Sequence, residues 1–477
     1  MNNTNNLKVK KEELDPKVLK VTIIMVIGAL APLLDSTMVN VALKTIASDM
    51  KTVISVVQWI TTGYVLAMGL TVPVSGWAVK RFGCKKIYVL SLFIFLIGSV
   101  LAMMSWNINS LICFAIIQGV GAGLLMPTLQ TELVQISGGR NLGRTMSIVS
   151  IPGLLGPIFG PVLGGIIVSS LSWRAIFFIN IPICLIAIPL SWRCIPADNL
   201  NENKPSLDIL GLLMLSPAFA LIIYGIAQIA SHGGISSSAV AVPLGVGIVL
   251  MIMFIIYALN TKREPILDLR LFKSRNFSAS NILLFLTGII TNGAMLMLPL
   301  YYQEVRGISA LYTGLWLIPQ GVGMLLTRSQ VGKIADRDGA RNIVMISLVV
   351  TAVGTLPFAF ADAGTSPILL ATALLVRGAG LGGLLISLMA SAYIGLNREQ
   401  IPHASTATRI FQTIGGAFGS AILATVLQHQ MASQTNLNAA SGAFNVAFWW
   451  TVAFAVIAII PTFLLPMHKK AKEESPQ

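Results

Sequence analysis

Apolar stretches about twenty residues long recur along the whole chain and are separated by short polar, mostly basic segments. At ~1.5 Å per residue, a helix of that length crosses a hydrocarbon core ~30 Å thick. Continuous apolar runs favour helices, because a transmembrane barrel would show alternating segments of about ten residues. We predict about fourteen spans, at residues 18–40, 54–77, 87–106, 110–133, 145–170, 176–194, 208–230, 238–260, 277–301, 308–330, 342–361, 367–395, 404–429 and 443–466.

The composition supports this interpretation. Hydrophobic residues make up 55% of the 477 residues and charged residues 10%, whereas a soluble protein has roughly 45–50% and about 25%. We therefore predict an all-α integral membrane protein.

The net charge of +14 could suggest a nucleic-acid partner, but the basic residues lie between the predicted spans. Under the positive-inside rule both termini are cytoplasmic and the number of spans is even. We therefore predict a multi-pass protein of the cell membrane with the lipid bilayer as partner and no nucleic acid. The predicted cytoplasmic segments are 78–86, 138–144, 195–207, 261–275, 331–341 and 396–403.

The chain contains a weak internal repeat with a nearly constant offset. GWAVKRFGCKK at 76–86 matches GKIADRDGARN at 332–342, an offset of 256 residues. QGVGAG at 118–123 matches RGAGLG at 377–382, an offset of 259, and Gly160 matches Gly415 at 255. We predict two related six-helix bundles, although chance recurrence of glycine is the alternative. The predicted parts are a tail 1–17, a bundle 18–194, an inserted helix pair with its loops 195–275, a bundle 276–466 and a tail 467–477.

The most unusual polar position is Asp35, in LLDSTMVNVAL at 33–43, inside the first span. An ionised group there costs at least a few kcal/mol, so an intramembrane carboxyl is a functional candidate by default. Burial favours its neutral form, and Asp35 could take up and release a proton as its exposure changes. The alternative is a carboxylate permanently paired by a neighbouring helix.

The predicted N-terminal bundle also contains two glycine motifs. In IPGLLGPIFGPVLGG at 151–165, glycines four residues apart permit close helix contact and prolines bend the span, which predicts a pivot. Small-residue packing alone is the alternative. This seam comprises Gly156, Gly160, Pro161, Gly164 and Gly165. In the loop after the second span, Gly76 and Gly83 permit a tight reversal around the basic Arg81.

These motifs resemble the major facilitator superfamily, and specifically its fourteen-helix drug:proton antiporter branch, over nearly the whole chain. WRAIFFINIP at 173–182, LDLRLF at 267–272 and IGGAFGSAI at 414–422 are also similar to branch signatures. The resemblance implies two six-helix bundles rocking about a central cavity, with the inserted pair outside. It also implies that Asp35 titrates, that the seam governs opening, that a proton gradient supplies the energy without a cofactor, and that the protein is monomeric.

Two residues depart from the branch pattern. Lys80 stands where the loop motif normally has Asp, so the charge latch of the N-terminal half is altered, while Asp336 and Arg337 retain it in the C-terminal copy. Ala115 stands where the fourth-helix motif has Arg. Arg377 either substitutes for that missing cation or hydrogen-bonds locally.

Several other polar residues and one methionine in the spans have two interpretations. They line or flank the cavity in related transporters, but ordinary interhelical hydrogen bonding or packing explains each about as well. The candidates are Gln118, Gln130, Glu132, Asn292, Met295, Gln320 and Arg377.

We therefore expect a proton-coupled exporter of small amphipathic or lipophilic compounds. An exporter of a metabolite or an anionic compound is the alternative, and a non-cycling transporter-like sensor is a third. No enzyme and no metal site is indicated, because the four histidines and four cysteines are scattered without catalytic or ligand-like spacing. No motif encodes the substrate.

Overall fold

The structure, a computed structural model, describes most of the chain between residues 16 and 465. The described residues are 16–52, 54–137, 148, 156, 159–160, 162–168, 170–196, 207–229, 236–261, 265–338, 340–397, 399–432 and 437–465. Twelve helices among them are long and apolar enough to cross a membrane. The predicted fifth span lies largely outside the described residues. A further helix, α10, is 29 residues long but less apolar. These elements agree with about fourteen membrane helices.

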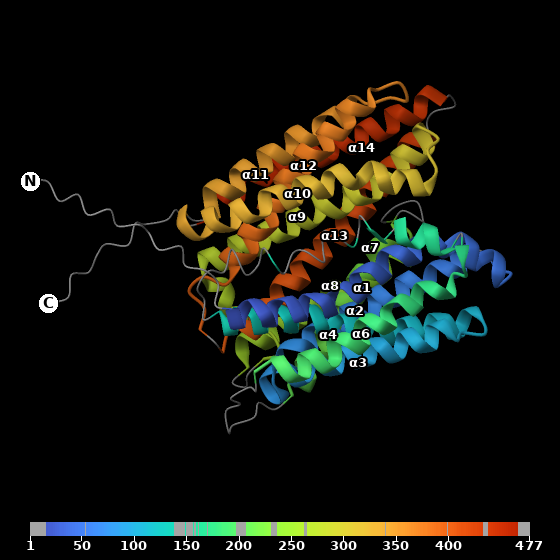
Figure 1. The fold of residues 1–477 in the computed structure, drawn as a ribbon. Helices are drawn as coiled ribbons and strands as arrows, with labels where there is room; N and C mark the ends of the chain where they lie inside the picture. The colour runs from blue at the N-terminus through green and yellow to red at the C-terminus, as the bar shows by residue number, and fades with distance from the viewer. Residues whose placement is uncertain are drawn as a thin grey trace, which may run out of the picture.

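The N-terminal half forms one bundle and the C-terminal half another, with α13 crossing between them (Figure 1). The first bundle contains α1 (Pro16–Asp49), α2 (Ile54–Phe82), α3 (Cys84–Met103), α4 (Ile108–Ile136) and α6 (Arg174–Cys194). The second contains α9 (Arg275–Leu300), α10 (Ala310–Asp338), α11 (Ala340–Thr355), α12 (Pro367–Ala392), α13 (Ile401–Ala432) and α14 (Leu437–Ile457). Short helical turns η1 (Leu269–Lys273), η2 (Tyr301–Val305), η3 (Leu356–Phe360) and α15 (Ile459–Thr462) complete the described elements.

The two bundles repeat the same helix contacts. Glycines of α4 pack against the backbone of α2 and α3, and glycines of α12 pack in the same way against α10 and α11. In the first bundle Gly119 lies against Tyr64, Gly121 against Ser91 and Gly123 against Met68. In the second bundle the corresponding contacts are Gly378 with Gln320, Gly380 with Ser347 and Gly382 with Met324. The glycines of the two bundles are 259 residues apart and their partners are 256 residues apart, so the repeat detected in the sequence corresponds to equivalent packing positions.

The inserted helices, α7 (Ile209–Ala227) and α8 (Ser238–Asn260), pack together, and α7 contacts both α2 and α13. Asp208 fastens the pair, because its carboxylate accepts hydrogen bonds from the backbone N–H groups of Gly211 and Ile266 and from the hydroxyl of Tyr257. The helix pair therefore lies outside the bundles, along the boundary between them.

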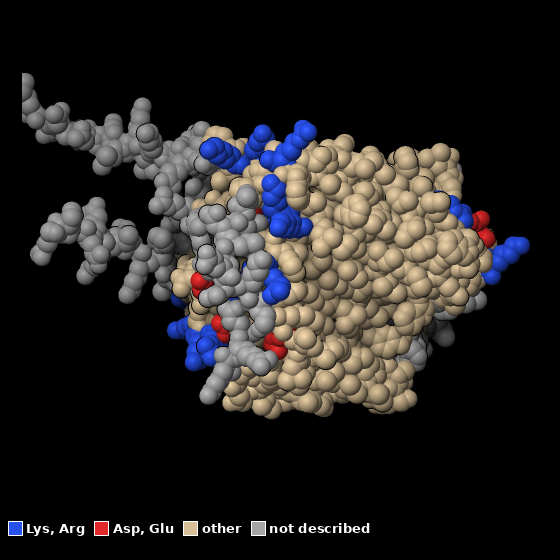
Figure 2. All heavy atoms as spheres, turned by 90° about the horizontal axis from the view of Figure 1, so that it is seen from below, with Lys and Arg blue, Asp and Glu red and all other residues tan. Residues whose placement is uncertain are grey.

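Basic residues gather at one end of the molecule (Figure 2), where α1 begins and α14 ends (Figure 1). We call this the basic end. The described residues there include Lys80, Arg81, Lys86, Arg193, Arg270, Lys273 and Arg275. Beginning and ending at the same end requires an even number of crossings, as the sequence predicts.

Candidate functional site

Asp35 lies in the interior of the N-terminal bundle, where α1 faces α4 and α6. Its side chain is 2% exposed. The amide Nδ2 of Asn180, on α6, donates to Asp35 Oδ1 at 2.5 Å. Gln118, on α4, reaches the same cluster through the hydroxyl of Ser99. A neutral amide from another helix therefore holds the carboxyl.

Ser99 on α3 completes this polar cluster. Its hydroxyl accepts from Gln118 Nε2 at 2.8 Å and from Asn180 Nδ2 at 3.4 Å, and donates to the carbonyl of Phe95. The amide oxygens of Gln118 and Asn180 have no hydrogen-bond partner among the described residues. A protonated Asp35 would supply the donor that these oxygens lack, so the cluster can hydrogen-bond both forms of the carboxyl.

Within the described part of the chain, no lysine or arginine pairs with Asp35; the described ion pair joins Asp49 and Arg174 at the opposite end. Ala115, where the branch has an arginine, is 2% exposed and lies one turn before Gln118. A buried carboxylate without a cation is strongly disfavoured. The Asp35 cluster is therefore a place where a proton, not a counter-ion, would neutralise the charge.

The described glycines of the 151–165 seam pack on the turn of α1 that carries Asp35. Gly156 lies against the backbone of Leu33, and its carbonyl accepts from Thr37 Oγ1 at 3.0 Å. Gly160 lies against the Thr37 side chain and Gly164 against the backbone of Met38. Side chains at these glycines would push α1 away, so the seam and the carboxyl are mechanically linked.

Gly165 of this seam is half-buried and Pro161 lies outside the described residues. The pivot itself remains a prediction.

The bundles contact each other near the basic end through hydroxyl groups. Thr131 on α4 and Ser405 on α13 share a hydrogen bond of 2.6 Å, and Ser75 on α2 and Thr406 on α13 share one of 3.2 Å. Gly76, from the loop motif, lies against the Pro402 carbonyl and so brings α2 and α13 together. This set of contacts joins the bundles at the basic end.

Gln130, a predicted cavity residue, belongs to the same set of contacts between the bundles. Its Nε2 donates to Met389 Sδ at 3.8 Å, and its Oε1 accepts from the Tyr393 hydroxyl at 3.4 Å. Met389 lies on α12 and Tyr393 directly follows its last residue, so both partners belong to the other bundle. Glu132, two residues further along α4, is 4% exposed, so it is buried and not solvated.

Arg377 hydrogen-bonds locally, one of its two predicted alternatives. Its Nη1 donates to Gln320 Oε1 at 2.6 Å and its Nη2 to the carbonyl of Ile290 at 3.2 Å, and its side chain is 1% exposed. All three residues belong to the C-terminal bundle. Arg377 therefore does not supply the cation that the Asp35 cluster lacks.

The two candidates on α9 differ in exposure. Asn292 is exposed and donates to the carbonyl of Gly288 in its own helix, whereas Met295 is half-buried. A role for either in a substrate cavity stays a prediction.

The loop motif turns sharply at Gly83, whose φ of 92° lies in the region that favours glycine. Arg81 stacks over the rings of Trp77 and Phe82. The side chains of Asp336 and Arg337 lie outside the described ones, so the latch predicted for the C-terminal copy remains a prediction.

Several members of the Asp35 cluster and of the contacts between the bundles were not predicted as site residues, among them Asn180, Ser99 and Thr131. Asn180 lies within the WRAIFFINIP signature, near the start of the predicted span 176–194, and its amide in an apolar helix was the available signal. Ser99 and Thr131 carried no such signal, because a hydroxyl in a helix ordinarily bonds its own backbone.

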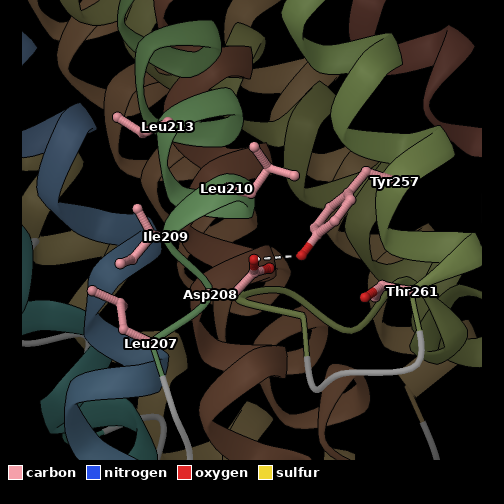
Figure 3. A pocket seen from close by; sticks show the side chains of 7 residues that line it. All are labelled: Leu207, Asp208, Ile209, Leu210, Leu213, Tyr257 and Thr261. Atoms are coloured by element: carbon pink, nitrogen blue, oxygen red, sulfur yellow. Dashed lines mark hydrogen bonds between the residues drawn. The ribbon is translucent and has the colours of Figure 1, made fainter.

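A surface cavity of about 530 Å³ lies beside the inserted pair (Figure 3). It is lined by Leu207, Asp208, Ile209, Leu210, Leu213, Tyr257 and Thr261. The Asp208 carboxylate points at the Tyr257 hydroxyl across it, and its other hydrogen bonds fasten the backbone. The cavity is separate from the Asp35 cluster, and its carboxylate has a structural task.

The chain resembles known proteins in sequence and in fold. A sequence model described as "Major Facilitator Superfamily" matches residues 25–420. The chain is 31% identical to the multidrug resistance protein B homolog of Mycobacterium tuberculosis, over 98% of this chain and 93% of that protein. It is 30% identical to the riboflavin transporter RibZ of Clostridioides difficile, over 95% and 99%. Among solved structures, the proton:xylose symporter XylE matches with a TM-score of 0.64 at 13% identity, over 94% and 95% of the two chains.

Proposed function

Because the chain belongs to the major facilitator superfamily, and is therefore a multi-pass membrane transporter and not an enzyme, we propose that it is a proton-coupled exporter of small amphipathic compounds. It exchanges substrate for protons by alternating access in the cell membrane. The named activity of the multidrug resistance homolog supports the substrate class.

The Asp35 cluster is the observation that carries this proposal. A carboxyl buried at 2% exposure, held by Asn180 and lacking a described cation, is a site for reversible protonation. The free amide oxygens beside it accept a hydrogen bond from the neutral form. Protonation then removes a charge from the bundle interior at the turn against which Gly156 and Gly160 pack.

The positive-inside rule assigns the basic end to the cytoplasm. The contacts Thr131–Ser405 and Ser75–Thr406 then hold the cytoplasmic side closed, as the outward-open state of our mechanism requires. In our mechanism this state takes up a proton at Asp35 and releases substrate. Separation of the hydroxyl pairs next opens the cytoplasmic side, where proton release and substrate binding follow.

The energetics are sufficient. One proton moving down 100 mV releases ~2.3 kcal/mol, which supports roughly a fiftyfold substrate gradient. One or two protons per cycle therefore drive useful export.

Everted membrane vesicles test the proposal. Respiration acidifies their lumen, and adding an exported amphipathic compound such as rhodamine B should release protons, read with a pH-sensitive dye. Asp35→Asn should abolish that release, whereas the matched variant Asp362→Asn, at an exposed loop carboxylate, should retain it. Undiminished release in Asp35→Asn would refute the role of Asp35.

A further inference from the structure

A second cation of the C-terminal bundle, Arg409, has surroundings quite unlike those of Arg377. It lies eight residues into α13, about 12 Å along the helix from the basic end. Its side chain is only half-buried. A charged residue within a membrane-spanning helix that keeps part of its side chain exposed is expected to face the bundle interior or a water-accessible space.

The position of Arg409 on α13 defines that space. Ser405 and Thr406, which contact the N-terminal bundle, precede Arg409 by four and three residues. Residues at these spacings share one helix face. Arg409 therefore points between the two bundles, one turn further from the basic end than the hydroxyl contacts that close it.

The partners of Arg409 leave most of its hydrogen-bonding capacity available. Its Nη1 donates to Gln412 Oε1 at 3.2 Å, and no carboxylate pairs with it among the side chains that the structure describes. Arg377, in contrast, is 1% exposed and donates to Gln320 and to a backbone carbonyl inside its own bundle. A guanidinium has five N–H donors and is always charged, so Arg409 lacks an acceptor for several of them.

The opposite wall is provided by α2. This helix packs against α13, and its Tyr64 is buried, with its hydroxyl donating to the Pro32 carbonyl at 3.5 Å. Met68 follows one turn later on the same face of α2 and is half-buried. The space thus combines one cation and one amide with an aromatic and a thioether surface.

We propose that Arg409 is an anion subsite of the transport pathway, which binds a carboxylate on an amphipathic substrate. One cation with one neutral amide matches a single negative charge, and a guanidinium can hold both oxygens of a carboxylate. Met68 and Tyr64 contact the apolar part of the same molecule. The inference rests on the proposed transport function and narrows its substrate class to organic acids and zwitterions.

Acid and ester pairs test the subsite directly. The full chain is reconstituted in lipid nanodiscs, and binding of rhodamine B, naproxen and their alkyl esters is followed by the fluorescence of each compound, with empty nanodiscs as the blank. At least one acid should bind tenfold or more tightly than its ester. Arg409→Gln should weaken acid binding by roughly tenfold to a hundredfold, the usual range for a charged hydrogen bond, and leave ester binding unchanged.

Two further variants complete the experiment. Arg306→Gln, at a half-buried cation near the opposite end, should bind like the unaltered chain. Arg409→Lys keeps the charge but not the planar pair of N–H donors, so it should weaken binding of the acid by less than Arg409→Gln does and leave binding of the ester unchanged. It carries the test alone if Arg409→Gln does not fold. The subsite is refuted if neither acid is preferred, or if the Arg409 variants affect acid and ester equally.

Proton release separates this inference from the proposed function. Acid preference without proton release in everted vesicles would overturn proton coupling and leave the subsite standing. Proton release by esters and acids alike, with no effect of Arg409→Gln, would overturn the subsite and leave proton coupling standing.

Discussion

Removing the two hydroxyl contacts between the bundles should open the basic end. Ser75→Ala with Thr131→Ala removes both interhelical hydrogen bonds, to Thr406 and Ser405, without removing a helix or a charge. Such bonds contribute ~0.6 kcal/mol each in membrane proteins. Together they favour the closed arrangement by ~1.2 kcal/mol, so their loss should raise the open population roughly eightfold.

Cysteine accessibility measures that population. Val72 is 1% exposed and lies one turn before Ser75 and Gly76 on the same face of α2. In a chain whose four natural cysteines are replaced by alanine, Val72→Cys should react with N-ethylmaleimide in proportion to the open fraction. We expect the doubly substituted chain to react roughly eightfold faster.

A matched pair of hydroxyls provides the control. Thr71 and Thr128 lie on the same helices, α2 and α4, but donate to carbonyls of their own helices, those of Ala67 and Leu124. Alanine at both should leave the alkylation rate unchanged. Equal rates in all three chains would refute the assignment of the hydroxyl pairs to the closure.

Three other changes test separate parts of the structure. Asn180→Leu removes the nearest donor to the buried carboxyl, a charged hydrogen bond of about 1.5–3 kcal/mol, and should lower substrate-induced proton release at least tenfold at equal protein level. Gly83→Ala should lower the unfolding temperature in detergent, because φ of 92° costs other residues about 1–3 kcal/mol; Gly245→Ala, which meets nothing within 4 Å, should not. The Trp173 indole N–H holds the pKa of Asp49 below its ordinary value, so its stabilisation is present above pH ~4 and is lost as pH falls further. Asp49→Asn should flatten that acid limb of thermal stability.

The sequence predicts the fold well because membrane helices identify themselves by length and apolarity. The repeat was also detectable, since glycines at helix crossings are difficult to replace: Gly119 and Gly378 both lie against a neighbouring backbone. Asp35 stood out for the opposite reason, as a charge that hydrocarbon excludes.

The sequence does not specify how each helix is rotated against its neighbours. Gln118 was predicted among the cavity candidates, and the rotation of α4 places it beside Asp35 and Ser99. Arg409 was not singled out, because nothing in its local sequence distinguishes an arginine between bundles from one inside a bundle, such as Arg377. The difference lies in which partners the tertiary structure supplies.

Proton-driven accumulation in proteoliposomes tests the central claim most directly. With the purified chain and an imposed pH gradient, rhodamine B should accumulate on the acidic side, and dissipating the gradient with nigericin should abolish the accumulation. Asp35→Asn should equilibrate the compound without accumulating it. Accumulation by Asp35→Asn equal to that of the unaltered chain would contradict the account.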